Sequence, residues 1–110
     1  MNTLSYAKYI EKLISINLDE LSLQELFALK LEYLYLCIDL SQFNFSMYTN
    51  LNYSYFNDLI RGKSAITLNK IENICHALNI TPIELFDFNP LYIMKKEKCF
   101  IKFPIYEGII

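Results

Sequence analysis

The sequence predicts a mainly α-helical bundle, with an extra helix at its N-terminus and a short β-hairpin or strand pair at its C-terminus. Apolar residues recur at helical spacing over most of the chain, and hydroxyl or amide side chains stand where helices would begin. Beyond residue 89 two β-prone runs flank a lysine-rich stretch. We expect three parts: an amphipathic helix and candidate dimerisation element at 1–21, a helical domain at 22–88, and a β-prone extension at 89–110.

The first two helices follow from apolar periodicity and a capping motif. Residues 3–16 place apolar side chains at helical spacing with charged residues on the other side, as in an amphipathic helix. Residues 17–21 interrupt this pattern. Ser22 followed three residues later by Glu25 is a capping-box signature, so the sequence predicts a second helix from Leu23 to Cys37.

Two short helices joined by a tight turn are predicted next. Ser41 can cap the first of them. Asn50 stands at the turn, where an asparagine tolerates a left-handed backbone, and Leu51 would anchor that turn in the core. Asn52 can cap the second short helix, and Gly62 can end it with a positive φ.

The second short helix has an apolar and a polar side. Phe56 and Leu59 are three residues apart and should face the core. The outward set is Tyr53, Ser54, Asn57 and Asp58.

Two further helices and the tail complete the organisation. Thr67 is the expected cap of a helix over residues 68–78, and Thr81 precedes a short helix that begins with Pro82. Residues 91–94 and 99–103 are β-prone and are separated by four charged residues, which predicts two short strands. A lone two-stranded ribbon is marginal in water, so it should pack on the helices or on a partner's tail.

The segment from about Leu31 to Phe86 resembles the Cro/cI-type (XRE-like) helix-turn-helix family of bacterial and phage regulators. The matching motifs are Leu40-Ser41-Gln42, Ser54-Tyr55-Phe56, Arg61-Gly62-Lys63-Ser64, Ile66-Thr67-Leu68, Ala77-Leu78-Asn79-Ile80-Thr81-Pro82 and Glu84-Leu85-Phe86. The resemblance implies a five-helix, lambda-repressor-like DNA-binding bundle that is often dimeric, with the second motif helix in the major groove of double-stranded DNA.

The resemblance also assigns roles to individual positions. Gln42 would bind a phosphate from the start of its helix, and Arg61 and Lys63 would lie near the DNA backbone. The groove-facing set would be Asn52, Tyr53, Ser54, Asn57 and Asp58. Phosphate contacts would fix the register, and contacts to base edges would carry the sequence information.

Charge and exposed apolar residues set the chain apart from that family. Residues 22–88 hold four basic and seven acidic residues, a net charge of −3, whereas DNA affinity depends on neutralising phosphates. Tyr35 stands where an arginine of the first helix often binds phosphate. Usually polar positions carry Phe43, Met47, Tyr48 and Ile60. These residues reflect either the Asn-, Ile-, Tyr- and Lys-rich composition of the chain or a protein interface, because contiguous apolar patches rarely stay bare.

Other functional classes find little support. Cys37, Cys75 and Cys99 are an odd number without Cys-x-x-Cys spacing, and His76 is the only histidine, so we expect free thiols in a reducing compartment and no metal site. With two glycines in the chain, no phosphate-cradling loop is expected, and no cofactor is implied. No apolar run approaches the ~20 residues needed to span a bilayer, and the N-terminus does not resemble a signal peptide, so the expected location is cytoplasmic.

The sequence therefore favours a homodimeric, sequence-specific DNA-binding transcriptional regulator, either a repressor or an autoregulator. The alternative is a protein-binding module that keeps the helix-turn-helix fold, such as a phage-encoded inhibitor or antirepressor, using the exposed aromatics. An enzyme is the third hypothesis, and no constellation of residues supports it.

Overall fold

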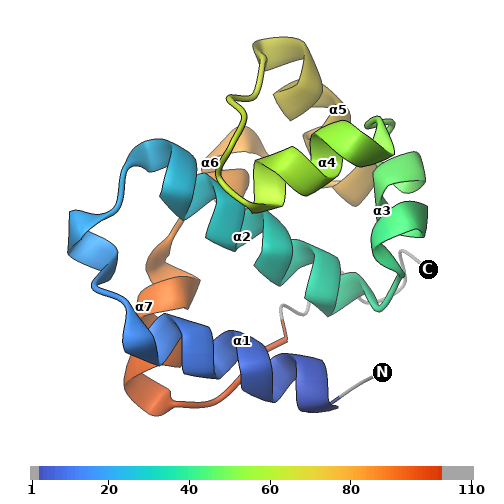
Figure 1. The fold of residues 1–110 in the computed structure, drawn as a ribbon. Helices are drawn as coiled ribbons and strands as arrows, with labels where there is room; N and C mark the ends of the chain where they lie inside the picture. Colours follow the sequence, from blue (N-terminus) through green and yellow to red (C-terminus); the bar gives the residue numbers. More distant parts are fainter. Residues whose placement is uncertain (1–2, 103–110) are drawn as a thin grey trace.

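Helix α2 (Leu23–Ile38) forms the centre of the computed structural model, which describes residues 3–102. Figure 1 shows α1 and α7 on one side of α2. Helices α3, α4 and α5 lie on the other side. The remaining elements are α1 (Thr3–Ser15), the 3-10 turn η1 (Leu18–Glu20), α3 (Gln42–Tyr48), α4 (Tyr53–Ile60), α5 (Leu68–Leu78), α6 (Pro82–Leu85) and α7 (Asn89–Glu97). The predicted helical bundle is confirmed.

Local capping bonds begin four of these helices as the sequence predicts. Ser22 accepts a hydrogen bond from the Glu25 backbone N–H, and the Glu25 carboxylate accepts one from the Ser22 backbone N–H, completing the capping box. The hydroxyl of Thr81 and the carboxylate of Glu84 form the same motif before α6. The caps of α3 and α5 are the hydroxyls of Ser41 and Thr67. Each bond satisfies an N–H group that has no partner within its helix.

Buried aromatic and aliphatic side chains join the helices into one core. From α2 this core takes Phe27, Leu31 and Leu34, each at most 4% exposed. Phe45 of α3 and Phe56 of α4 are completely buried and pack together, with ring centroids 5.3 Å apart. The inward orientation predicted for Phe56 is therefore confirmed.

The predicted C-terminal β-hairpin is wrong, because the first of its two runs belongs to helix α7. Pro90 lies in the first helical turn, where its fixed φ suits a helix. Leu91 and Met94 are three residues apart and completely buried, whereas Tyr92 and Ile93 between them are exposed. This is helical spacing, and packing of α7 against α1 outweighs the β-propensity of the side chains.

The second predicted strand is also absent from the residues that the structure describes. Lys98 ends α7 with φ +55°, and residues 99–102 have no regular secondary structure. Phe103, the last residue of that expected strand, lies outside the described range. Phe100 stacks on Tyr6 of α1 with ring centroids 3.9 Å apart. The chain after α7 is therefore held to the bundle by aromatic packing.

Two lysines stabilise helix ends instead of facing solvent. Lys30 is completely buried, and its ammonium group donates to the backbone carbonyls of Glu84 and Asp87. Lys95 of α7 donates to the carbonyls of residues 13, 14 and 16 at the end of α1. A cation at a helix C-terminus satisfies free carbonyls and interacts favourably with the helix dipole.

Cys37 and Cys75 are buried, and Cys99 is exposed. No group of three or more potential metal-ligating side chains occurs within residues 3–102. Across the same range, no helix combines the length and apolar character needed to cross a membrane.

Candidate nucleic-acid interface

The turn between α3 and α4 fixes the angle between these helices. Asn50 adopts φ +58°, the left-handed conformation expected for it. The backbone N–H of the next residue, Leu51, donates to the carbonyl of Ser46, and the Leu51 side chain is 5% exposed. Thr49 is buried, and its hydroxyl donates back to the carbonyl of Phe45. The turn is thus closed by backbone bonds and anchored in the core.

Both ends of α4 are fixed as well. The amide oxygen of Asn52 accepts hydrogen bonds from the backbone N–H groups of Ser54 and Tyr55, at 2.9 and 3.3 Å. At the other end Gly62 adopts φ +71°, and its carbonyl accepts a hydrogen bond from the side-chain amide of Gln24 on α2. Beneath the helix, Phe56 and Leu59 are buried. The opposite side of α4 is therefore held rigidly towards solvent.

Most residues of the predicted site lie on α4 or directly beside it, whereas Gln42 lies at the start of α3. Five of the eight are exposed: Asn52, Tyr53, Ser54, Arg61 and Lys63. The other three, Gln42, Asn57 and Asp58, are half-buried. Tyr53 and Asn57 are four residues apart and so lie on one face of α4. The amide oxygen of Asn52 is used in capping, which leaves its amide N–H groups as the donors that it offers to a ligand.

Two short helices at a fixed angle, with a polar second helix facing solvent, form a helix-turn-helix. Residues 38–90 match the family model of the Cro/C1-type helix-turn-helix DNA-binding domain. Over these residues the chain is therefore similar to the Cro/C1-type helix-turn-helix DNA-binding domain. The match begins at the end of α2 and extends to the start of α7. No curated protein and no solved structure matches the chain.

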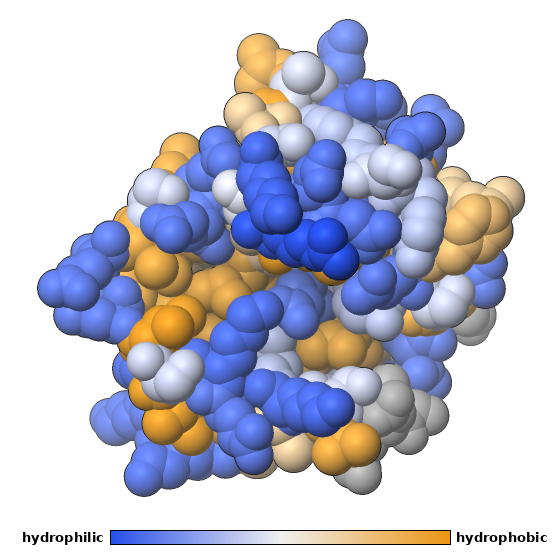
Figure 2. Space-filling model, in the orientation of Figure 1, coloured by the Kyte–Doolittle hydropathy of each residue, from blue (hydrophilic) through white to orange (hydrophobic). Residues whose placement is uncertain are grey.

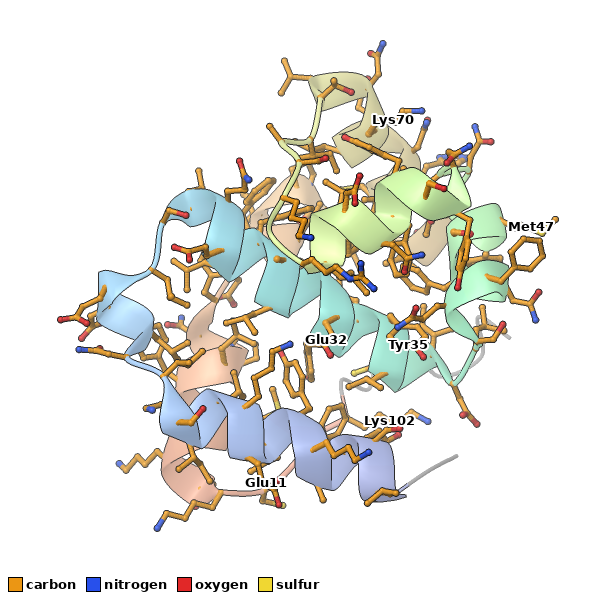
Figure 3. All side chains as sticks on the ribbon, in the orientation of Figure 1. Glu11, Glu32, Tyr35, Met47, Lys70 and Lys102 are labelled. Atoms are coloured by element: carbon orange, nitrogen blue, oxygen red, sulfur yellow. The ribbon has the colours of Figure 1, made fainter. Side chains whose placement is uncertain are left out.

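Fewer basic side chains are exposed on this Cro/C1-type domain than its sequence contains. Of the four basic residues within 22–88, Lys30 is buried and bonded to backbone carbonyls. Arg61 and Lys63 are exposed directly after α4, and Lys70 is half-buried on α5. Figure 3 places Lys70 at the far end of the molecule from α1. Arg61 and Lys63 are therefore the domain's exposed cations nearest to α4.

The apolar residues at usually polar positions do not all behave alike. Phe43 and Met47, four apart on α3, are 53% and 63% exposed, and Tyr48 is 41% exposed. Ile60, in contrast, is half-buried and packs against the core, so it does not join an exposed patch. Phe43 contacts Tyr53 of α4 edge-to-face, with ring centroids 5.5 Å apart. We call Phe43, Met47 and Tyr53 the aromatic edge; Figure 2 shows apolar atoms over α3 at this margin of the molecule.

A cleft beside Gln42 was not foreseen from the sequence. It has a volume of about 300 Å³ and lies between α1 and the α2–α3 pair. Its wall includes Lys8 and Lys12 of α1, together with Tyr35 and Gln42. The signal in the sequence was the spacing of the two lysines, four apart on one side of an amphipathic helix. The side of α2 that this helix covers cannot be read from that spacing.

Proposed function

We propose that this protein is a sequence-specific DNA-binding transcriptional regulator that acts as a repressor or autoregulator. The Cro/C1-type domain supports DNA binding and a regulatory role. The observation that carries the finer proposal is the outward face of α4, where exposed Tyr53 and Ser54 lie beside half-buried Asn57. In the proposed complex this face enters the major groove, where asparagine and serine side chains can hydrogen-bond base edges.

The two ends of the motif would position α4 on the DNA. Gln42 at the start of α3 would bind a phosphate through its side-chain amide, and Arg61 and Lys63 would bind backbone phosphates beyond α4. Contacts of this kind set the register without reading sequence. Asp58 would be repelled by phosphates and would fit best where it accepts a hydrogen bond from a cytosine amino group.

We further propose a homodimer that binds a palindromic site. Two copies related by a two-fold axis would place two α4 helices in successive turns of the major groove. The high hydrophobic content of the chain, 54%, and the exposed side chains of Leu68 and Ile83 support association between copies. The domain boundaries at residues 21/22 and 88/89, and dimerisation through residues 1–21, stay predictions.

Replacement of the base-reading side chains tests this function. A Ser54→Ala/Asn57→Ala variant should lose about 30-fold to about 10,000-fold in affinity for a selected DNA site, if each side chain contributes about 1–3 kcal/mol of discrimination. Affinity for random DNA should change little. Asn73→Ala on α5 is the control, since Asn73 is half-buried like Asn57 but lies outside the motif. Equal affinity of the double variant and wild type for the selected site would refute the assignment of α4 as recognition helix.

A protein-binding module is the second candidate, and the aromatic edge is the observation that favours it. Phe43 and Met47 expose large apolar surfaces that contribute nothing to phosphate binding. In that case Phe43→Ala/Met47→Ala would abolish binding to a partner protein and leave DNA affinity unchanged. Loss of DNA affinity in this variant, without unfolding, would instead place the aromatic edge within the DNA interface.

A further inference from the structure

Helix α1 brings two lysines to the side of the domain on which the DNA-binding residues lie. The cleft between α1 and the α2–α3 pair is lined by Lys8, Lys12, Tyr35 and Gln42. A second hollow of about 300 Å³ is lined by Lys12, Arg61 and Gly62, among others. Lys12 therefore lies between the Gln42 end and the Arg61 end of the helix-turn-helix. Figure 2 shows this hollowed face.

The two lysines in the cleft differ in how far their charge is free to bind a ligand. Lys12 donates to Glu32 of α2 at 2.7 Å, so its charge is largely compensated. Lys8 is exposed and forms no ion pair within residues 3–102. Figure 3 shows Glu32 and Tyr35 on the side of α2 between α1 and α4, and Glu11 on the opposite edge of α1. Among the residues that line the cleft, Glu32 is the acidic one.

Two neutral groups in the cleft add hydrogen-bonding capacity. Burial raises the pKa of Tyr35, with a smaller contribution from the charge of Glu32, so its hydroxyl remains a donor at neutral pH. Gln42 contributes amide N–H groups from the start of α3. A lysine ammonium, a tyrosine hydroxyl and a glutamine amide can each donate a hydrogen bond to an anion with several oxygens.

We propose that Lys8 of α1, together with Gln42, binds a backbone phosphate of the DNA duplex that α4 reads. The proposal rests on the proposed function, because the cleft adjoins Gln42 at the start of the motif. It makes α1 a part of the DNA interface that supplies positive charge from outside the acidic domain at residues 22–88. The phosphate belongs to the duplex because Gln42 opens the first helix of the motif and Lys12, in the wall of the cleft, also lines the hollow beside Arg61.

The salt dependence of DNA binding tests the role of Lys8. Lys8→Gln should weaken binding to the selected site and to random DNA by the same factor, and should reduce the slope of log K against log salt by about 1. Lys96→Gln is the control, because Lys96 is an exposed lysine on α7 and lines neither hollow. It should leave both affinity and slope unchanged.

Glu32→Gln tests the same cleft by a change that should raise DNA affinity instead of lowering it. It removes the acidic group of the cleft and releases Lys12, so affinity should rise roughly three- to eightfold at 0.1 M salt and the slope should steepen by about 1. A misfolded variant would not bind DNA more tightly.

The outcomes separate the two proposals. Wild-type protein that binds no DNA would refute the proposed function and with it the role of α1. Wild-type protein that binds DNA, with unchanged salt slopes for both Lys8→Gln and Glu32→Gln, would refute the role of α1 alone.

Discussion

Phe56 and Phe43 lie on neighbouring helices of the motif, and truncation to alanine should destabilise the fold far more at Phe56 than at Phe43. Phe56 is completely buried under α4, where its ring contacts Phe45 at 5.3 Å and Tyr35 at 6.2 Å between centroids. Truncating a buried phenylalanine to alanine costs about 3–5 kcal/mol, and the two lost aromatic contacts, each worth about 0.5–1.5 kcal/mol, place this site near the upper end of that range. Since a domain of this size is stable by about 5–15 kcal/mol, Phe56→Ala should remove between a third and all of that stability.

Phe43 provides the matched control for this measurement. Its side chain is 53% exposed, and its aromatic contact is the one with Tyr53. Phe43→Ala should therefore cost about 1 kcal/mol or less, the value of a single partly solvated aromatic pair. Urea unfolding followed by circular dichroism gives both free energies. Similar losses for the two variants, or a loss below about 1 kcal/mol for Phe56→Ala, would mean that the faces of α3 and α4 are assigned wrongly.

Two further predictions concern buried polar groups. Lys30→Met should fill the same space but remove the ammonium hydrogen bonds to the carbonyls of Glu84 and Asp87, lowering the free energy of unfolding by about 2 kcal/mol. Equal or greater stability in urea unfolding would mean that these hydrogen bonds do not offset the burial of the charge. Tyr9→Phe should cost about 1 kcal/mol at pH 7, because the Tyr9 hydroxyl donates to the carbonyl of Leu29 in the core. Burial raises the pKa of Tyr9 well above 10.0, so the folded state holds this proton more tightly than the unfolded state. The stability that Tyr9 contributes is fully present below pH 10 and is lost as the pH rises above it. The difference in the free energy of unfolding between wild type and Tyr9→Phe should therefore shrink in unfolding curves measured from pH 7 to 11. A difference that is independent of pH would contradict this.

Features decided within three or four residues could be predicted from the sequence. The caps formed by Ser22, Ser41 and Asn52 depend on hydrogen bonds to backbone groups two or three positions away. The left-handed turn at Asn50 and the helix end at Gly62 depend on the conformational tolerance of single residues. The same local logic explains why residues 68–78 were predicted as a helix with its bounds as observed.

Features decided by distant partners could not be predicted. Lys30 reads as a surface cation in the sequence, but its acceptors lie 54 and 57 residues away. Residues 91–94 are helical because α7 packs against α1, so their β-propensity was misleading. The candidate site divides in the same way: positions in α4 followed from periodicity, whereas the cleft beside Gln42 required knowledge of where α1 docks.

The central claim is that α4 reads a specific DNA sequence despite the acidic balance of the domain. Selection of binding sites from a random duplex library at two salt concentrations tests it most directly. We predict enrichment of a palindrome, with affinity that falls steeply as the salt concentration rises. No enriched sequence at either concentration, from protein shown to be folded by circular dichroism, would contradict the claim and favour a protein partner bound at the aromatic edge.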